Sequence, residues 1–269
     1  MDGNLFRLFA LFLSLISLGL LFYLRDKRHV SGILIVVLSL VLLLYKSGET
    51  IYFAQEGKSV IPYEVSHLAY WVVPFLFLVG LPGSDYAGGA LAFVCGVGFL
   101  LGAFIRPADL IANMTLYEDI RLLFTHELFF FLSLLSLFTY RSFLGKDYWS
   151  FVMTMFFFLL YFLLLRYRVI FPKEDFSSYS IALRVMDGSL VNYLIPDASL
   201  TWRILFASFC IGLIFLVPWL LLLLNQAWFR QEIKKGKVKE SDVPLEHRYG
   251  LIPWLQRKKC ESKIIPFSR

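Results

Sequence analysis

Apolar residues run along the chain in long, almost unbroken stretches that short polar segments separate. A helix needs about 20 apolar residues to cross a hydrocarbon core of ~30 Å, so length identifies the membrane spans better than periodicity does. A segment that faces lipid must also be helical to satisfy its backbone amides. The pattern therefore predicts an all-α, polytopic membrane bundle of about seven transmembrane helices. The predicted spans are 4–24, 30–46, 61–81, 87–105, 120–140, 149–171 and 202–228.

The composition agrees with this fold class. Of the 269 residues, 58% are hydrophobic and only 17% are charged, whereas about 25% of the residues of a typical soluble protein are charged. The first apolar stretch is too long for a signal peptide, and its positive charges follow it rather than precede it. We therefore expect one membrane domain over residues 1–228 and a basic tail over residues 229–269.

Lysine and arginine residues in the connections predict the orientation of the chain. Three lie in 25–29, two in 141–148 and 11 in the tail, which together hold 16 of the 26 basic residues. With seven spans these regions share one side, so we expect a cytoplasmic C-terminus, an outside N-terminus and a location in the cell membrane. The net charge of +6 then indicates membrane orientation and contact with anionic lipid rather than nucleic-acid binding.

Ionisable residues inside the spans gather toward the predicted outer side. Such residues are expensive in hydrocarbon and usually mark a functional site. His67 and His126 lie at a similar depth, about 9 Å below the outer helix ends at 1.5 Å per residue. We therefore expect the third and fifth spans to bring both imidazoles into one polar cavity open to the outside. The candidate residues are Glu64, Ser66 and His67 in the third span and Arg121, His126 and Glu127 in the fifth.

Acyl chemistry is one use of such a cluster. A histidine with its pKa near neutral can act as a general base, and a serine hydroxyl with an adjacent base can act as a nucleophile. Ser66 would then be the nucleophile and His126 the base, and either Glu127 or Glu64 would orient the base. Glu64, His67 and Arg121 are the candidate residues for substrate contact.

Two other kinds of chemistry are weaker. The spacing of Glu64 and His67 is found in carboxylate-bridged metal bundles, but such a site needs a second pair with the same spacing, which the sequence lacks. No metal and no cofactor is therefore predicted. An anion transporter could use Lys46, Arg106 and Arg121, although no internal repeat supports transport.

Four short motifs follow one another between residues 30 and 228: IPYEVSH at 61–67, FTHELFF at 124–130, NYLIP at 192–196 and VPW at 217–219. Their order resembles the YwaF-like integral membrane proteins, which are related to the androgen-induced-gene-like membrane lipid hydrolases and acyltransferases. The resemblance implies that His126 occupies the base position and Ser66 the nucleophile position. It also implies that Asn192 and Tyr193 match an element of the family, for which we suggest the role of a hydrogen-bonded lid over the cavity.

The chain departs from this family at two positions. Glu64 stands where the family pattern has histidine, and Ser66 stands where it has cysteine. The leading expectation is an integral membrane protein whose outward-facing polar cavity binds a lipid or amphiphile, with acyl transfer or ester hydrolysis through Ser66 and His126. Two alternatives stay open: a non-catalytic scaffold or complex subunit that binds a protein through the tail or the outer connection 172–201, and a transporter or receptor.

Overall fold

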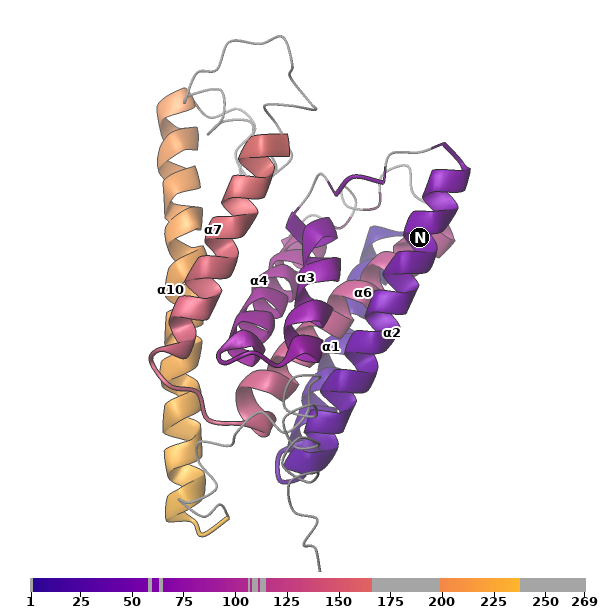
Figure 1. Cartoon of the computed structure of the whole chain (residues 1–269). Helices are drawn as coiled ribbons and strands as arrows, with labels where there is room; N and C mark the ends of the chain where they lie inside the picture. The colour runs from indigo at the N-terminus through magenta and orange to yellow at the C-terminus, as the bar shows by residue number, and fades with distance from the viewer. Residues whose placement is uncertain are drawn as a thin grey trace, which may run out of the picture. The chain divides into compact units, whose positions relative to one another are not determined.

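The computed structural model describes residues 2–57, 60–62, 65–105, 107, 111, 115–165 and 199–237. Within these ranges the chain is helical and forms no strand, and six helices are long and apolar enough to cross a membrane. The predicted all-α membrane bundle is therefore confirmed. The helices are α1 (Gly3–Leu24), α2 (Arg28–Gln55), α3 (Val65–Val79), α4 (Ser84–Ile105), α6 (Leu116–Leu135), the π-helix η1 (Ser136–Tyr140), α7 (Asp147–Leu165) and α10 (Leu200–Lys234), as Figure 1 shows.

The third predicted span is shorter than expected. α3 has 15 residues, which reach about 22 Å at 1.5 Å per residue and fall short of a hydrocarbon core of ~30 Å. The helix ends at Val79 because Gly80 adopts the left-handed backbone, with φ of 67°, a conformation that favours glycine and commonly terminates helices. In the described ranges, six helices are long enough to cross a membrane, and α3 is a shorter apolar helix.

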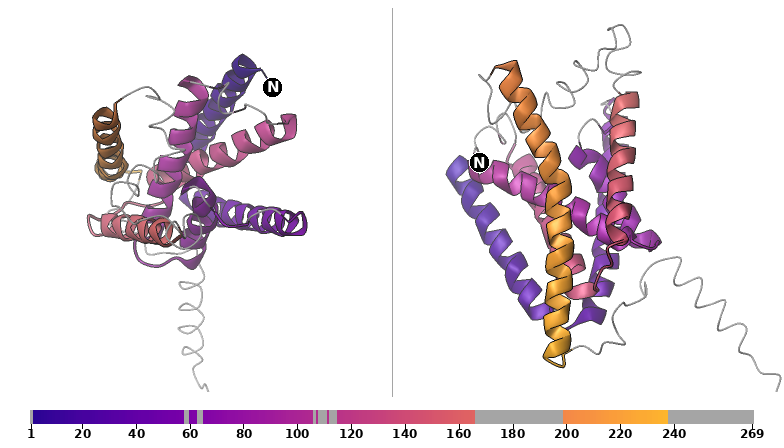
Figure 2. Two further views of the ribbon diagram at one scale, coloured as in Figure 1. Left: turned by 90° about the horizontal axis from the view of Figure 1, so that it is seen from above. Right: turned by 90° about the vertical axis from the view of Figure 1, so that its left-hand side faces the viewer.

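Two helices extend beyond their predicted ends. α2 continues past Lys46 to Gln55, because Glu49 lies one turn later and pairs with Lys46 inside the helix. The predicted membrane span ends at Lys46, whereas the helix itself continues beyond this residue. α10 likewise runs without interruption from Leu200 to Lys234, although Pro218 lies inside it (Figure 2).

The chain divides into two compact units, and both boundaries fall inside helices. Residues 1–151 and 221–269 make up the first unit, which holds α1 to η1, the first turn of α7 and the last part of α10. Residues 152–220 make up the second unit, which holds the rest of α7 and α10. Every interaction discussed below lies within the first unit.

Small residues on α4 allow the helices of the first unit to approach closely. α4 is buried along most of its length and packs against α3 and α6. A Cβ atom added at Gly96 would lie 2.8 Å from the backbone nitrogen of Phe130, and one at Gly89 would lie 2.8 Å from Ser136 Oγ. α4 and α6 are therefore antiparallel and in backbone contact, which is the role that small residues play in membrane bundles.

The polar contacts define two ends of this bundle. Phe6 and Ala10 of α1 cluster with Leu123 of α6, and Ser14, one turn after Ala10, contacts Glu127, one turn after Leu123. The two helices therefore run in the same direction. Glu49, late in α2, pairs with Arg121, early in α6. We call this the Glu49 end. That this end lies toward the outer side of the membrane stays a prediction.

The opposite end is joined by buried polar groups around Arg141. Its guanidinium lies 3.2 Å from Asp147 and 3.8 Å from Asp85. Asn225 of α10 donates a hydrogen bond to the Arg141 carbonyl oxygen at 3.0 Å and accepts one from the Phe143 amide at 2.9 Å. These bonds fix the connection between η1 and α7 against α4 and the last part of α10.

Gly96→Ala should lower the free energy of unfolding by roughly 1–3 kcal/mol, because the added methyl group overlaps the backbone of Phe130. Gly98→Ala is the matched control, since an added Cβ there meets no atom within 4 Å. The control should be neutral or stabilising by up to about 1 kcal/mol, because alanine forms helices better than glycine. Thermal unfolding in one detergent measures both variants. Equal melting temperatures would contradict the close contact of α4 with α6.

Candidate functional site

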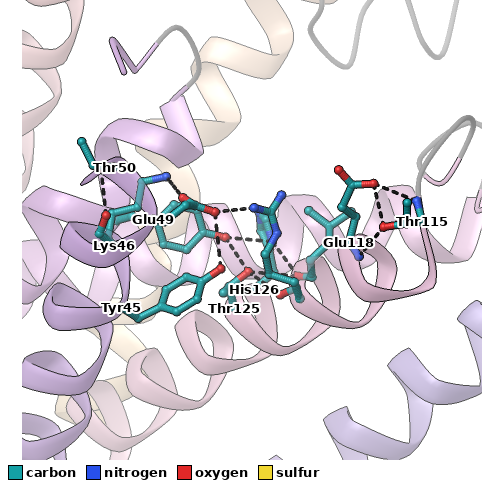
Figure 3. Close-up of polar contacts among 11 residues, drawn as sticks. Tyr45, Lys46, Glu49, Thr50, Thr115, Glu118, Thr125 and His126 are labelled. Atoms are coloured by element: carbon teal, nitrogen blue, oxygen red, sulfur yellow. Dashed lines mark hydrogen bonds and ion pairs between the residues drawn. The ribbon is translucent and has the colours of Figure 1, made fainter. Parts of the chain in front are cut away.

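Glu49 lies between two cations that come from different helices. Its carboxylate forms ion pairs with Lys46 on α2 and with Arg121 on α6, and the Tyr45 hydroxyl donates to it at 3.4 Å. Figure 3 shows Tyr45, Lys46 and Glu49 beside α6. The side chains of Lys46 and Glu49 are 11% and 12% exposed, and that of Arg121 is 27% exposed. One carboxylate with two cations leaves an excess of one positive charge.

Tyr70 of α3 connects this ion cluster to α6. Its hydroxyl donates to Thr125 Oγ1 at 2.8 Å and lies 3.1 Å from His126 Nδ1. Its ring stacks on Phe129, with 4.7 Å between the ring centroids. The ammonium group of Lys46 lies 5.3 Å from the centre of the Tyr70 ring, within the range of a cation–π interaction. Helices α2, α3 and α6 therefore meet at Tyr70.

His126 is buried among aromatic rings, and its hydrogen bonds assign its tautomer. The side chain is 6% exposed and stacks on Phe99 of α4 at 4.2 Å. Nδ1 lies 3.0 Å from the carbonyl oxygen of Leu122, which can only accept a hydrogen bond, so we place the proton on Nδ1. Nε2 then carries the lone pair, and no residue in the described ranges hydrogen-bonds to it. Nε2 is therefore the nitrogen that can accept a proton.

Glu127 faces a different helix from His126. Its carboxyl group lies 2.7 Å from Ser14 Oγ on α1, whereas His126 contacts Tyr70 on α3. Consecutive residues of a helix point in directions about 100° apart, since one turn holds 3.6 residues. The predicted contact in which Glu127 orients His126 is not formed, and the Leu122 carbonyl oxygen and the Tyr70 hydroxyl hold the imidazole instead.

Ser66 and His67 lie in the first turn of α3, and His67 interacts electrostatically with His126. Ser66 is half-buried and His67 is exposed, and neither a hydrogen bond nor a ring contact joins them to His126 in the described part of the chain. The aromatic side chain of α3 that contacts His126 is Tyr70, which lies one turn after His67. The expected cavity that would hold both imidazoles stays a prediction.

The remaining predicted residues divide into two groups. Arg121 lies in the ion cluster, while Glu64, Asn192 and Tyr193 fall outside the described residues, as does most of the connection 172–201 and of the tail. Their roles stay predictions. Among the described residues, no group of three or more His, Cys, Asp or Glu side chains is arranged to hold a metal ion.

Sequence reasoning missed Glu49 and Tyr70 as members of the site. Lys46 and Glu49 stand at i and i+3, a spacing that indicates an ion pair on one helix face and could have kept them inside the span. Tyr70 stands three residues after His67, so it shares that face of α3. The residues around Tyr70 in the sequence are mostly apolar, which is typical of a core residue rather than of a site residue.

Comparison with known proteins assigns no family: no family model, no curated protein and no solved structure matches the chain. The resemblance to the YwaF-like proteins rests on the four sequence motifs and stays a prediction. In the described part of the chain, six helices have the length and apolar composition of membrane spans, which is consistent with an integral membrane protein.

Proposed function

We propose that this integral membrane protein binds an amphiphile whose anionic head group contacts Lys46 and Arg121 at the Glu49 end. The observation that carries the proposal is the ion cluster itself, which places two cations and one carboxylate in an apolar bundle. Ionisable groups at such positions are rarely kept without a function, because their desolvation is costly.

The charge of the cluster supports an anionic ligand. Glu49 neutralises only one of its two partners, so a second anion would complete the pairing. Arginine binds carboxylate and phosphate groups through two parallel hydrogen bonds. Arg121 is the most exposed member of the cluster, at 27% of its side chain, and is therefore the residue that a head group would reach first.

The surroundings of Arg121 on α6 support an amphiphile rather than a free anion. Tyr117 and Phe124 stand four residues before and three residues after Arg121, so they lie on the same helix face. They are 70% and 59% exposed, and Ile120 beside them is 44% exposed. An apolar tail could lie along this face while the head group contacts Arg121. Tyrosine near a helix start also fits the membrane interface.

A second candidate function, acyl transfer or ester hydrolysis, is favoured by the tautomer of His126. In this reaction Nε2 takes the proton of the Ser66 hydroxyl as Oγ bonds to the substrate carbonyl carbon. The imidazolium then returns the proton to the departing alcohol, and water or a second alcohol releases the acyl group. Ser66 has to move into hydrogen-bond reach of Nε2, and catalytic hydrogen bonds often tighten only when substrate binds.

Lys46→Gln should abolish a preference for anionic lipid. In nanodiscs or detergent we expect the unchanged protein to bind a fluorescent lipid with an anionic head group about tenfold more tightly than its zwitterionic counterpart with the same chains, a difference of about 1.4 kcal/mol. Lys146→Gln, a change of an exposed lysine, is the matched control and should keep the preference. Equal binding of both lipids by the unchanged protein would overturn the proposal and favour a scaffold.

His126→Gln and Ser66→Ala should each remove any lipid hydrolase or acyltransferase activity that the purified protein shows, while the melting temperature stays within a few degrees. The controls are His29→Ala and Ser208→Ala at exposed positions, which should keep the activity. Product release from acyl-labelled lipids, followed by mass spectrometry, measures the effect. Full activity in Ser66→Ala would exclude this serine as the nucleophile.

A further inference from the structure

Ser14 takes part in two short oxygen–oxygen contacts at once. Its Oγ lies 2.7 Å from Oε1 of Glu127 and 2.9 Å from the carbonyl oxygen of Ala10. A serine hydroxyl carries one proton, and a carbonyl oxygen can only accept. If Glu127 were ionised, one of the two contacts would bring lone pairs together with no proton between them. A protonated Glu127 satisfies both, since it donates to Ser14 and Ser14 donates to Ala10.

The second oxygen of Glu127 gives an independent reason for the neutral form. Oε2 is buried and has no hydrogen-bond partner among the described residues, and the whole residue is only 4% exposed. A bare carboxylate oxygen in such a place carries the cost of an uncompensated buried charge. The carbonyl oxygen of a neutral acid carries the much smaller cost of one unsatisfied polar atom.

No neighbouring cation compensates a charge on Glu127. Arg7 lies on the same helix as Ser14 but two turns earlier, and the cations of the ion cluster are held by Glu49. In the described part of the chain no side chain other than Ser14 forms a hydrogen bond or ion pair with Glu127. The titratable residues on the helices of the first unit up to α6 are Arg7 and Tyr23 (α1), Arg28, His29, Tyr45, Lys46, Glu49 and Tyr52 (α2), His67 and Tyr70 (α3), Asp85, Tyr86 and Cys95 (α4), and Tyr117, Glu118, Asp119, Arg121 and His126 (α6).

We propose that Glu127 is a proton-binding site and that the bound proton holds α1 against α6. The relay from Glu127 to Ser14 to Ala10 is the polar part of this contact, and the apolar part consists of Phe6 and Ala10 packed with Leu123. Loss of the proton leaves a negative charge in this contact and breaks the relay. The proposal is independent of head-group binding, because neither Ser14 nor Glu127 belongs to the ion cluster.

Infrared difference spectroscopy of the full chain in nanodiscs tests the proposal. At neutral pH the spectrum of the unchanged protein minus that of Glu127→Gln should contain the carbonyl stretch of a protonated carboxylic acid. Ser14→Ala should move this band to higher frequency, because the acid loses its acceptor. Glu56→Gln, at an exposed position, is the control and should remove only carboxylate bands. If Glu127→Gln also removes only carboxylate bands, the proposal is wrong.

A second measurement keeps the test valid if Glu127→Gln folds poorly. The Ser14→Ala variant is then sufficient for the test. If every protonated-acid band keeps its frequency in that variant, the proposal is wrong. The pH dependence of the melting temperature tests whether the proton on Glu127 stabilises the contact of α1 with α6. Raising the pH until the band disappears should lower the melting temperature of the unchanged protein, whereas Glu127→Gln, which cannot lose a proton, should show no such fall.

Discussion

The pairing of Glu49 with Lys46 and Arg121 is the interaction on which the arrangement of α2, α3 and α6 depends. Removing one member of a buried ion pair typically costs about 3–5 kcal/mol, because the partner is left as an uncompensated charge. The whole stability of a domain is commonly only about 5–15 kcal/mol. The carboxylate of Glu49 therefore fixes how α2 meets α6, and Tyr70 brings α3 to the same point through Thr125 and His126.

The polar region around Arg141 and the ion cluster at the Glu49 end differ in their charge balance and in their exposure. Arg141 faces two aspartates and is buried, and Asn225 satisfies backbone groups beside it. That region joins chain segments and leaves no excess positive charge. The ion cluster at the Glu49 end has an excess of one positive charge and a partly exposed Arg121. Of these two regions, the ion cluster is the one that fits the anion proposed above.

The length of the apolar stretches predicted the helices, because a single segment that crosses lipid can pair its backbone N–H and C=O groups only by forming a helix. It did not predict that α2 continues as a helix beyond Lys46, where Glu49 pairs with Lys46. The sequence grouped His126 with Glu127 in one polar cluster but did not show which neighbouring helix each side chain faces. His126 and Glu127 are adjacent in sequence, yet they face α3 and α1, and only the packed neighbours decide which helix each one meets.

A double-mutant cycle between Glu49 and Arg121 tests the central claim most directly. The free energies of unfolding of Glu49→Gln, Arg121→Gln and the double variant are measured in one detergent and compared with the unchanged protein. A buried pair predicts that the double variant loses less stability than the sum of the single losses, with a coupling of about 1–3 kcal/mol. Single effects that add to within about 0.5 kcal/mol would contradict the ion cluster and the site built on it.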